Sequence, residues 1–444
     1  MASTQRKYKL IISGIALTVF VVFYLFIVSN KTPDLSVGYI LTVIPPIVGS
    51  IFLLFISSKN DSPIPITVSL LFAFLLITGN AYQTVIAKNS QEKTLLLNVI
   101  ALCFAVCMIT GYVFFIKKRV LSNKKGYQLA MIIVSSIIVF LFLLLFVFGS
   151  NIGGARLWLR IGSFTLELSE IIKFLFFLLL ALLYNSNINV KKKIIIGASA
   201  LTICSVCFAL LNEFGTVIIL FSVYLISFYV HIRSRYSALM IGGFIVILTI
   251  ALAVIFGTHE HIKEASGFFA EKLNKIYSRL TLEDTDQMKR ALQGMINGGL
   301  FGASMNYIID VYSIEADFAL AGISQYFGLV IMLLCIVFAC GIMYLVYICG
   351  RDDELNNRSR YKLSYILTVA IATQVILSLS GNIGLPVAGV GMPGISAGGT
   401  QMMILYTEIA FIVYGIQTDS SLEKQIKHNP HKNIRRSFYV EDKV

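Results

Sequence analysis

The sequence predicts an all-α membrane protein with about twelve transmembrane helices. Hydrophobic residues make up 57% of the 444 residues and charged residues only 13%, a balance that a soluble protein of this length does not have. The apolar residues form runs of about 20, the length that crosses ~30 Å of hydrocarbon. Lysine and arginine gather in alternate connections, so the net charge of +13 reflects membrane topology rather than a nucleic-acid partner.

Each expected span follows from an apolar run. The first run starts at Leu10, is too long for a signal-peptide core and has no small-residue cleavage site, so we expect it to be retained. The long run 193–231 is divided at Asn212–Glu213, because polar side chains belong at a water-facing turn. The twelve expected spans are 10–29, 37–57, 64–87, 94–116, 127–149, 166–184, 193–211, 214–231, 237–256, 318–348, 362–381 and 399–416.

The basic clusters predict that both termini face the cytoplasm. Segments 150–165, 212–213, 257–317 and 382–398 then face outward. We divide the chain into N-terminal transmembrane helices (1–149), a core (150–417) that includes the outer loop 257–317, and a cytoplasmic tail (418–444).

Two outward segments carry polar residues at the start of a span. Trp158, the only tryptophan, follows Arg156 closely, and this pair suits either a phosphate-bearing headgroup or a simple aromatic anchor with snorkelling arginines. Glu170 and Lys173 are spaced i,i+3 and can pair, either as a structural ion pair or as the polar floor of a substrate cavity. Glu213 is most simply a solvated turn residue.

The outer loop 257–317 is the longest polar stretch. Within it, 262–280 has apolar residues at a helical spacing and a basic face that includes Arg279. This pattern predicts a surface helix that attracts anionic lipid or a diphosphate, or simply presents a solvated face. Gly298–Gly302 indicates a turn with close backbone contact. His259 and His261 are too weak a signal to predict a metal site.

Asp317 lies directly before a long apolar run, at the mouth of a membrane helix. A carboxylate at a partly desolvated mouth can serve as a general base, and the alternative is an N-cap of that helix. Segment 381–401 contains seven glycines and two prolines. Such irregular backbone at membrane depth is tolerated where it lines a cavity, so we expect a re-entrant wall of a binding site.

Six stretches, in order, resemble motifs of the SEDS family (shape, elongation, division, sporulation), the RodA, FtsW and SpoVE type of peptidoglycan glycosyltransferase. They are G-A-R-L-W (154–158), L-E-L-S-E-I-I-K (166–173), L-N-E-F-G-T (211–216), the stretch Gln287–Gly302, I-E-A-D-F-A-L (314–320) and L-P-V-A-G-V-G-M-P-G-I-S (385–396).

The resemblance implies the family's ten helices with two more before them, and an enzyme that polymerises lipid II at the outer face of the bacterial cytoplasmic membrane. It implies a class B penicillin-binding protein and membrane lipids as partners, and a divalent cation, Mg²⁺ or Mn²⁺. Asp317 matches the catalytic aspartate, which is thought to deprotonate the 4-hydroxyl of the acceptor. The residues expected to bind substrate are Arg156, Trp158, Glu170, Lys173, Glu213, Arg279, Gln287 and Ser396.

Several departures from the motifs keep two other functions open. The family's His-Thr before the aspartate is Glu315-Ala316 here, its following acidic pair is Ser324-Gln325, and one of its prolines is Gly391. These changes favour a catalytically silent scaffold or regulator of an envelope machine. Charged residues inside spans also fit a transporter of a lipid-linked substrate.

Overall fold

The structure is a computed structural model that describes residues 2–31, 42–58, 62–86, 99–100, 106, 124–152, 154–162, 164–232, 286–350, 359–385 and 389–417. Within these residues, eight helices are long and apolar enough to cross a membrane. The expected span 237–256, almost all of the span 94–116, and the loop residues 257–285 with Arg279 lie outside the described residues. The predicted surface helix 262–280 therefore stays a prediction.

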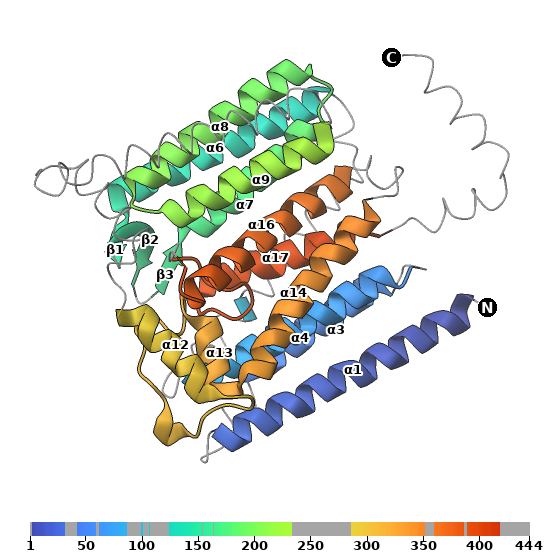
Figure 1. Cartoon of the computed structure of the whole chain (residues 1–444). Helices are drawn as coiled ribbons and strands as arrows, with labels where there is room; N and C mark the ends of the chain where they lie inside the picture. The colour runs from blue at the N-terminus through green and yellow to red at the C-terminus, as the bar shows by residue number, and fades with distance from the viewer. Residues whose placement is uncertain are drawn as a thin grey trace, which may run out of the picture.

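The described spans confirm the helical fold that the sequence predicts (Figure 1). The long helices are α1 (Ala2–Lys31), α4 (Ile64–Ile86), α6 (Lys124–Phe148), α7 (Leu168–Asn185), α8 (Val190–Leu210), α9 (Phe214–Ile232), α14 (Leu329–Cys349) and α16 (Ser359–Asn382). Two shorter helices, α3 (Ile44–Ser57) and α17 (Gly399–Gly415), have 14 and 17 residues.

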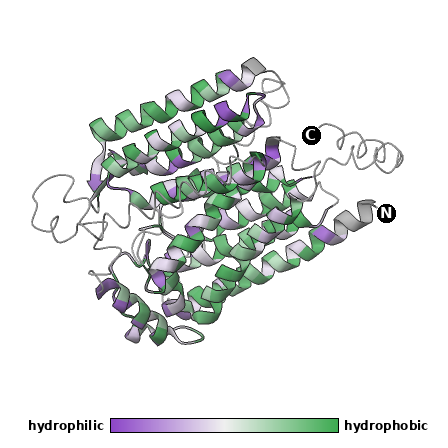
Figure 2. Cartoon of the chain, turned by 45° about the horizontal axis from the view of Figure 1, so that its top comes forward, coloured by the Kyte–Doolittle hydropathy of each residue, from purple (hydrophilic) through white to green (hydrophobic). Residues whose placement is uncertain are grey.

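Burial separates central helices from lipid-facing ones. Helices α4, α7 and α16 are mostly buried, whereas α1, α6, α8 and α14 are mostly exposed although they are at least as apolar. Because an apolar surface at this length faces hydrocarbon in a membrane protein, the second group forms the lipid-facing surface (Figure 2). In the centre, α16 packs against α7, α9, α14 and α17.

The expected single span 318–348 is wrong, because the structure breaks it at Gly328. Helix α13 (Ala319–Phe327) ends there and α14 begins at Leu329. Gly328 has φ of 97°, and a Cβ at this position would collide with the carbonyl of Leu300. Only glycine adopts this backbone at no cost, so the sequence stops the helix at this residue.

The outer loop packs against this break. Helix α12 (Asp286–Gly298) is followed by the tight turn that the glycines predict, in which Gly302 N donates to Gly298 O at 2.8 Å. Leu329 N then donates to Gly299 O at 2.9 Å, which joins the turn to the start of α14. A short 3-10 turn, Met305–Tyr307, leads on toward Asp317.

The structure also contains a small three-stranded sheet, which the all-α prediction did not include. Strands β1 (Ser150–Ile152), β2 (Ala155–Ile161) and β3 (Phe164–Glu167) are antiparallel in the order β1-β2-β3. The alternation in A-R-L-W-L-R-I is a strand pattern. Both connections turn at glycines with positive φ, Gly154 (81°) and Gly162 (60°). The sheet sets Trp158 opposite Glu167, just before α7.

The two ends of the described chain lie at the same end of the bundle. Helix α1 begins and α17 ends there, away from the sheet and α12 (Figure 1). All outward segments that the sequence predicts and the structure describes lie at the opposite end, where the candidate site is found.

Candidate active site

A cavity of about 590 Å³ lies at the end of the bundle that carries the sheet and α12. The sheet, the starts of α7, α9 and α17, helix α12, and the segments before α13 and α17 all contribute to its wall. Seven of the residues expected to form the site line it: Trp158, Glu170, Lys173, Glu213, Gln287, Asp317 and Ser396. Arg156 does not line the cavity and is exposed on β2.

Three of the lining carboxylates stand immediately before helices. Glu167 is the N-cap residue of α7, Glu213 precedes α9, and Asp317 precedes Phe318, the N-cap residue of α13. Negative charge is stabilised at the positive end of a helix dipole. The fold therefore collects acidic side chains in one wall by pointing helix starts at one cavity.

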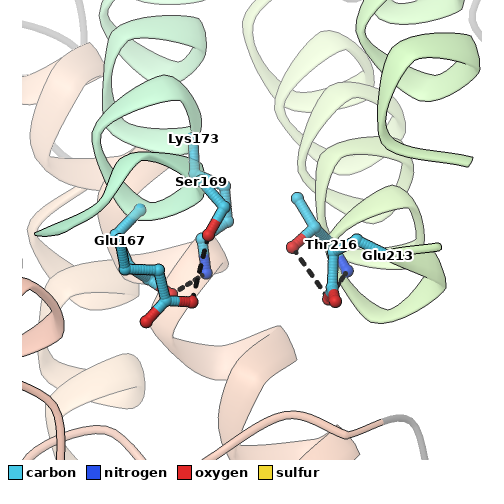
Figure 3. Close-up of polar contacts among 6 residues, drawn as sticks. Glu167, Ser169, Lys173, Glu213 and Thr216 are labelled. Atoms are coloured by element: carbon cyan, nitrogen blue, oxygen red, sulfur yellow. Dashed lines mark hydrogen bonds and ion pairs between the residues drawn. The ribbon is translucent and has the colours of Figure 1, made fainter. Parts of the chain in front are cut away.

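The ion pair between Glu170 and Lys173 is confirmed, and both residues line the cavity. Lys173 Nζ donates to Glu170 Oε1 at 2.6 Å, and both side chains are buried (Figure 3). A further carboxylate, Glu408 from α17, is also buried and interacts electrostatically with the pair. Lys173 is thus a buried cation balanced by acids on two helices.

Glu167 holds its proton unusually tightly. Burial, and then the neighbouring charge of Glu170, raise the pKa of its carboxyl group from 4.5 to about 8. Ser169 Oγ donates to Glu167 Oε1 at 3.0 Å, and Thr400 Oγ1 accepts from Glu167 N at 3.0 Å, which ties the start of α7 to α17. Near neutral pH this carboxyl group is largely protonated.

Glu213 is more than the solvated turn residue that the sequence suggests. Its Oε1 accepts from both Thr216 N and Thr216 Oγ1, each at 3.2 Å, which caps the start of α9 (Figure 3). The turn before it is tied to the sheet, because Asn212 Nδ2 donates to Gly154 O at 3.0 Å and Arg156 N to Leu211 O at 3.3 Å. Sheet and helix start therefore form one wall.

The segment that carries Asp317 is held by its backbone. Asn382 Nδ2 donates to Asp317 O at 3.0 Å, and Phe318 N donates to Ser313 O at 3.2 Å. Because Phe318 rather than Asp317 occupies the N-cap position of α13, the N-cap alternative is wrong. Two residues of α4 hold the preceding carbonyls: Tyr82 Oη donates to Ile314 O at 2.6 Å and Gln83 Nε2 to Glu315 O at 3.1 Å.

The glycine-rich segment before α17 lines the cavity as predicted, with non-helical backbone at residues 389–398. Ser396 Oγ donates to Ala316 O at 2.7 Å and accepts from Met392 N at 2.7 Å. Ala397 N donates to Glu315 O at 2.7 Å. Ser396 therefore braces the segment that ends in Asp317.

Sequence reasoning missed several lining residues. Glu167 was hidden inside a matched motif, and Tyr312 is an ordinary loop residue. Gln374 was detectable, because a polar side chain inside an apolar span indicates a function. Among the described residues, no three His, Cys, Asp or Glu side chains are grouped so as to hold a metal ion, so these residues do not provide a preformed site for the divalent cation.

The family comparison covers most of the chain. Residues 61–421 match the family described as FtsW, RodA and SpoVE cell cycle proteins. The matched region begins well before residue 150, where the resemblance of the motifs begins. The "probable peptidoglycan glycosyltransferase FtsW" of Bacillus subtilis is 25% identical over 363 residues, 76% of this chain and 87% of that protein. Its namesake from Wigglesworthia glossinidia brevipalpis is 26% identical over 287 residues, 62% and 72% of the two chains.

Solved structures show the same fold at low identity. A chain from a study of "polymerization and crosslinking by a peptidoglycan synthase complex" superposes with a TM-score of 0.59 at 15% identity, covering 80% of this chain and 97% of the other. The rod shape determining protein RodA of Thermus thermophilus superposes with a TM-score of 0.53 at 16% identity, covering 79% and 95%.

Proposed function

Because the chain belongs to the FtsW, RodA and SpoVE family of cell cycle proteins, we propose that it is a membrane-embedded peptidoglycan glycosyltransferase that polymerises lipid II. The names of its relatives support the reaction class. The observation that carries the proposal is the position of Asp317, in the wall of a polar cavity and immediately before a helix.

In the proposed reaction, Asp317 accepts the proton of the acceptor's sugar 4-hydroxyl. The alkoxide oxygen forms a bond to the anomeric carbon of the donor, whose bond to the diphosphate oxygen breaks, and undecaprenyl diphosphate leaves with the electron pair. A base must lie within hydrogen-bond reach of the proton it takes. The backbone contacts from Asn382, Gln83 and Ser396 support such a fixed position.

The leaving diphosphate needs positive charge that the described cavity wall provides only in part. Lys173 is the single Lys or Arg among the described lining residues, and it is bonded to Glu170. Arg156 and Arg279 stay candidates for this role. A divalent cation carried with the diphosphate is compatible with the absence of a three-ligand group in the described part of the chain, but no step above depends on it.

In the proposed orientation both termini are cytoplasmic and the cavity faces the outer surface of the bacterial cytoplasmic membrane. The partner would be a class B penicillin-binding protein that crosslinks the new strands. Support for a partner is the fold shared with a chain of a peptidoglycan synthase complex.

The test is polymerisation of labelled lipid II by the detergent-purified protein, alone and with its candidate partner. Wild type should form glycan, and Asp317→Asn should form none while keeping its fold and partner binding. Asp310→Asn is the matched control, because this aspartate lies in the same loop, is exposed and does not line the cavity; it should retain activity. Glycan made equally well by Asp317→Asn would remove Asp317 as the base.

If wild type binds its partner but makes no glycan with any lipid-linked saccharide, the scaffold function replaces the enzyme. If the purified protein in vesicles instead moves the lipid across the bilayer, the transporter function replaces the enzyme.

A further inference from the structure

Gln374 is a buried amide that lines the candidate cavity. It lies in the middle of α16, its side chain is only 6% exposed, and it contributes to the cavity wall together with Glu170 and Lys173. Its carboxamide makes no hydrogen bond with any residue that the structure describes. A buried polar group without a partner destabilises a fold, so a residue kept in this state at a cavity wall points to a ligand.

The described residues around Gln374 disfavour an anion as that ligand. The nearby cation, Lys173, is bonded to Glu170 at 2.6 Å, and Glu213 adds another carboxylate to the same cavity. A phosphate would therefore meet acidic side chains with no unengaged cation among the described lining residues. Phosphate oxygens at pH 7 would also leave the carbonyl oxygen of Gln374 unsatisfied, since they only accept hydrogen bonds.

A neutral group with both a donor and an acceptor fits better. The carboxamide offers two N–H donors and one carbonyl acceptor, so it can donate to the carbonyl oxygen of a trans secondary amide or accept from the N–H of that amide. We propose that Gln374 binds the acetamido group of the amino sugar in the lipid-linked substrate. This inference rests on the proposed function, because it names the substrate group that the same cavity reads.

The proposal is tested by comparing two lipid-linked disaccharides, one with acetamido groups and one with the corresponding free amines. Wild type should favour the acetamido substrate in kcat/KM by about 10-fold, the size of one buried hydrogen bond. Gln374→Leu should lose activity on the acetamido substrate and bring this ratio close to one. Gln374→Glu should invert the preference, because a carboxylate attracts the ammonium group.

Stability separates a ligand-binding residue from a structural one. Gln374→Leu should keep or raise the thermal unfolding midpoint of the ligand-free protein, because it removes no hydrogen bond to a described residue, even as it lowers kcat/KM. Tyr406→Phe is the matched control: Tyr406 carries a buried hydroxyl without a partner in the described residues, and it does not line the cavity. This variant should also be more stable, but with unchanged kcat/KM and substrate preference.

A lower unfolding midpoint in Gln374→Leu, with the substrate preference unchanged, would overturn the inference.

A binding measurement separates failure of this inference from failure of the proposed function. In the Asp317→Asn background, the Kd of each labelled lipid is measured with Gln374 and with Leu at this position. Selective weakening of the acetamido lipid upholds the inference even if no polymer forms, and equal affinities in both proteins reject it even if polymer does form.

Discussion

At the scale of single residues, Lys173 balances the buried acids. It pairs with Glu170 of its own helix and interacts electrostatically with Glu408 of α17, and all three side chains are buried. Removing one partner of a buried ion pair leaves an uncompensated charge and costs about 3 to 5 kcal/mol. We therefore expect Lys173→Met to lower the free energy of unfolding by this amount, measured by denaturant unfolding in detergent.

A double variant separates charge balance from shape. Adding Glu170→Gln to Lys173→Met should recover part of the lost stability, because it removes the carboxylate that Lys173→Met leaves without its cation. Lys191→Met, at an exposed lysine that starts α8, is the control and should change stability little. Equal losses in the single and double variants would show that packing rather than charge sets the cost.

Glu167 makes the stability of the fold depend on pH. Its folded pKa of about 8 lies above the ordinary 4.5 because of burial and the charge of Glu170. The folded state thus binds this proton more tightly than the unfolded state, so stability is lost as pH rises from about 4.5 to 8. Glu167→Gln keeps an acceptor for Ser169 but cannot ionise. Its stability gain over wild type should grow across this window and level off above it, followed by thermal unfolding at each pH.

A pH-independent difference between Glu167→Gln and wild type would contradict the raised pKa. Glu315→Gln serves as the control. Glu315 carries a carboxyl group near the candidate site. Its hydrogen bonds with Gln83 and Ala397 are accepted by its backbone carbonyl, so the substitution leaves them in place.

At the scale of elements, α4 holds the segment that leads to Asp317, although α4 lies outside the motifs that carry the resemblance. Gln83 Nε2 donates to Glu315 O at 3.1 Å and to Ile395 O at 2.7 Å. One side chain therefore joins the segment that leads to Asp317 to the segment that leads to Ser396. Gln83→Ala should lower kcat by about 10- to 100-fold, because misplacing a catalytic group costs rate, while KM changes little. Gln83→Met would reproduce the loss if hydrogen bonding rather than packing is the cause.

A rise in KM with unchanged kcat would instead place Gln83 in substrate binding.

The helices also show what a sequence pattern conceals. Gly328 interrupts an apolar run that is long enough to be one span, because its positive φ and missing Cβ let the backbone pack against the Leu300 carbonyl. That contact joins residues from the outer loop to the helix start, so no local pattern contains it.

At the scale of the whole molecule, the sequence predicted the helical fold and singled out seven of the residues that line the candidate cavity, because both depend on local signals. Apolar runs mark spans, and Asp317, Glu213 and Lys173 stand out as charges at or within them. The small sheet was missed because its strands lie in a short outward segment between two spans. Gln374 was missed, although a polar side chain inside an apolar span is a usable signal, because it lies outside the stretches that carry the family resemblance.

The placement of the cavity at one end of the bundle predicts its accessibility from outside the cell. Helix α1 begins and α17 ends at the opposite end (Figure 1), which the basic clusters assign to the cytoplasm. Tyr307, 71% exposed in the outer loop, lies at the cavity end, and Lys191 lies at the other end. In intact cells, a membrane-impermeant maleimide should label Tyr307→Cys, and it should label Lys191→Cys only after permeabilisation. Wild type, analysed in parallel, measures the labelling of the native cysteines. The reverse pattern would place the cavity in the cytoplasm, where a lipid-linked acceptor on the outer leaflet could not reach Asp317.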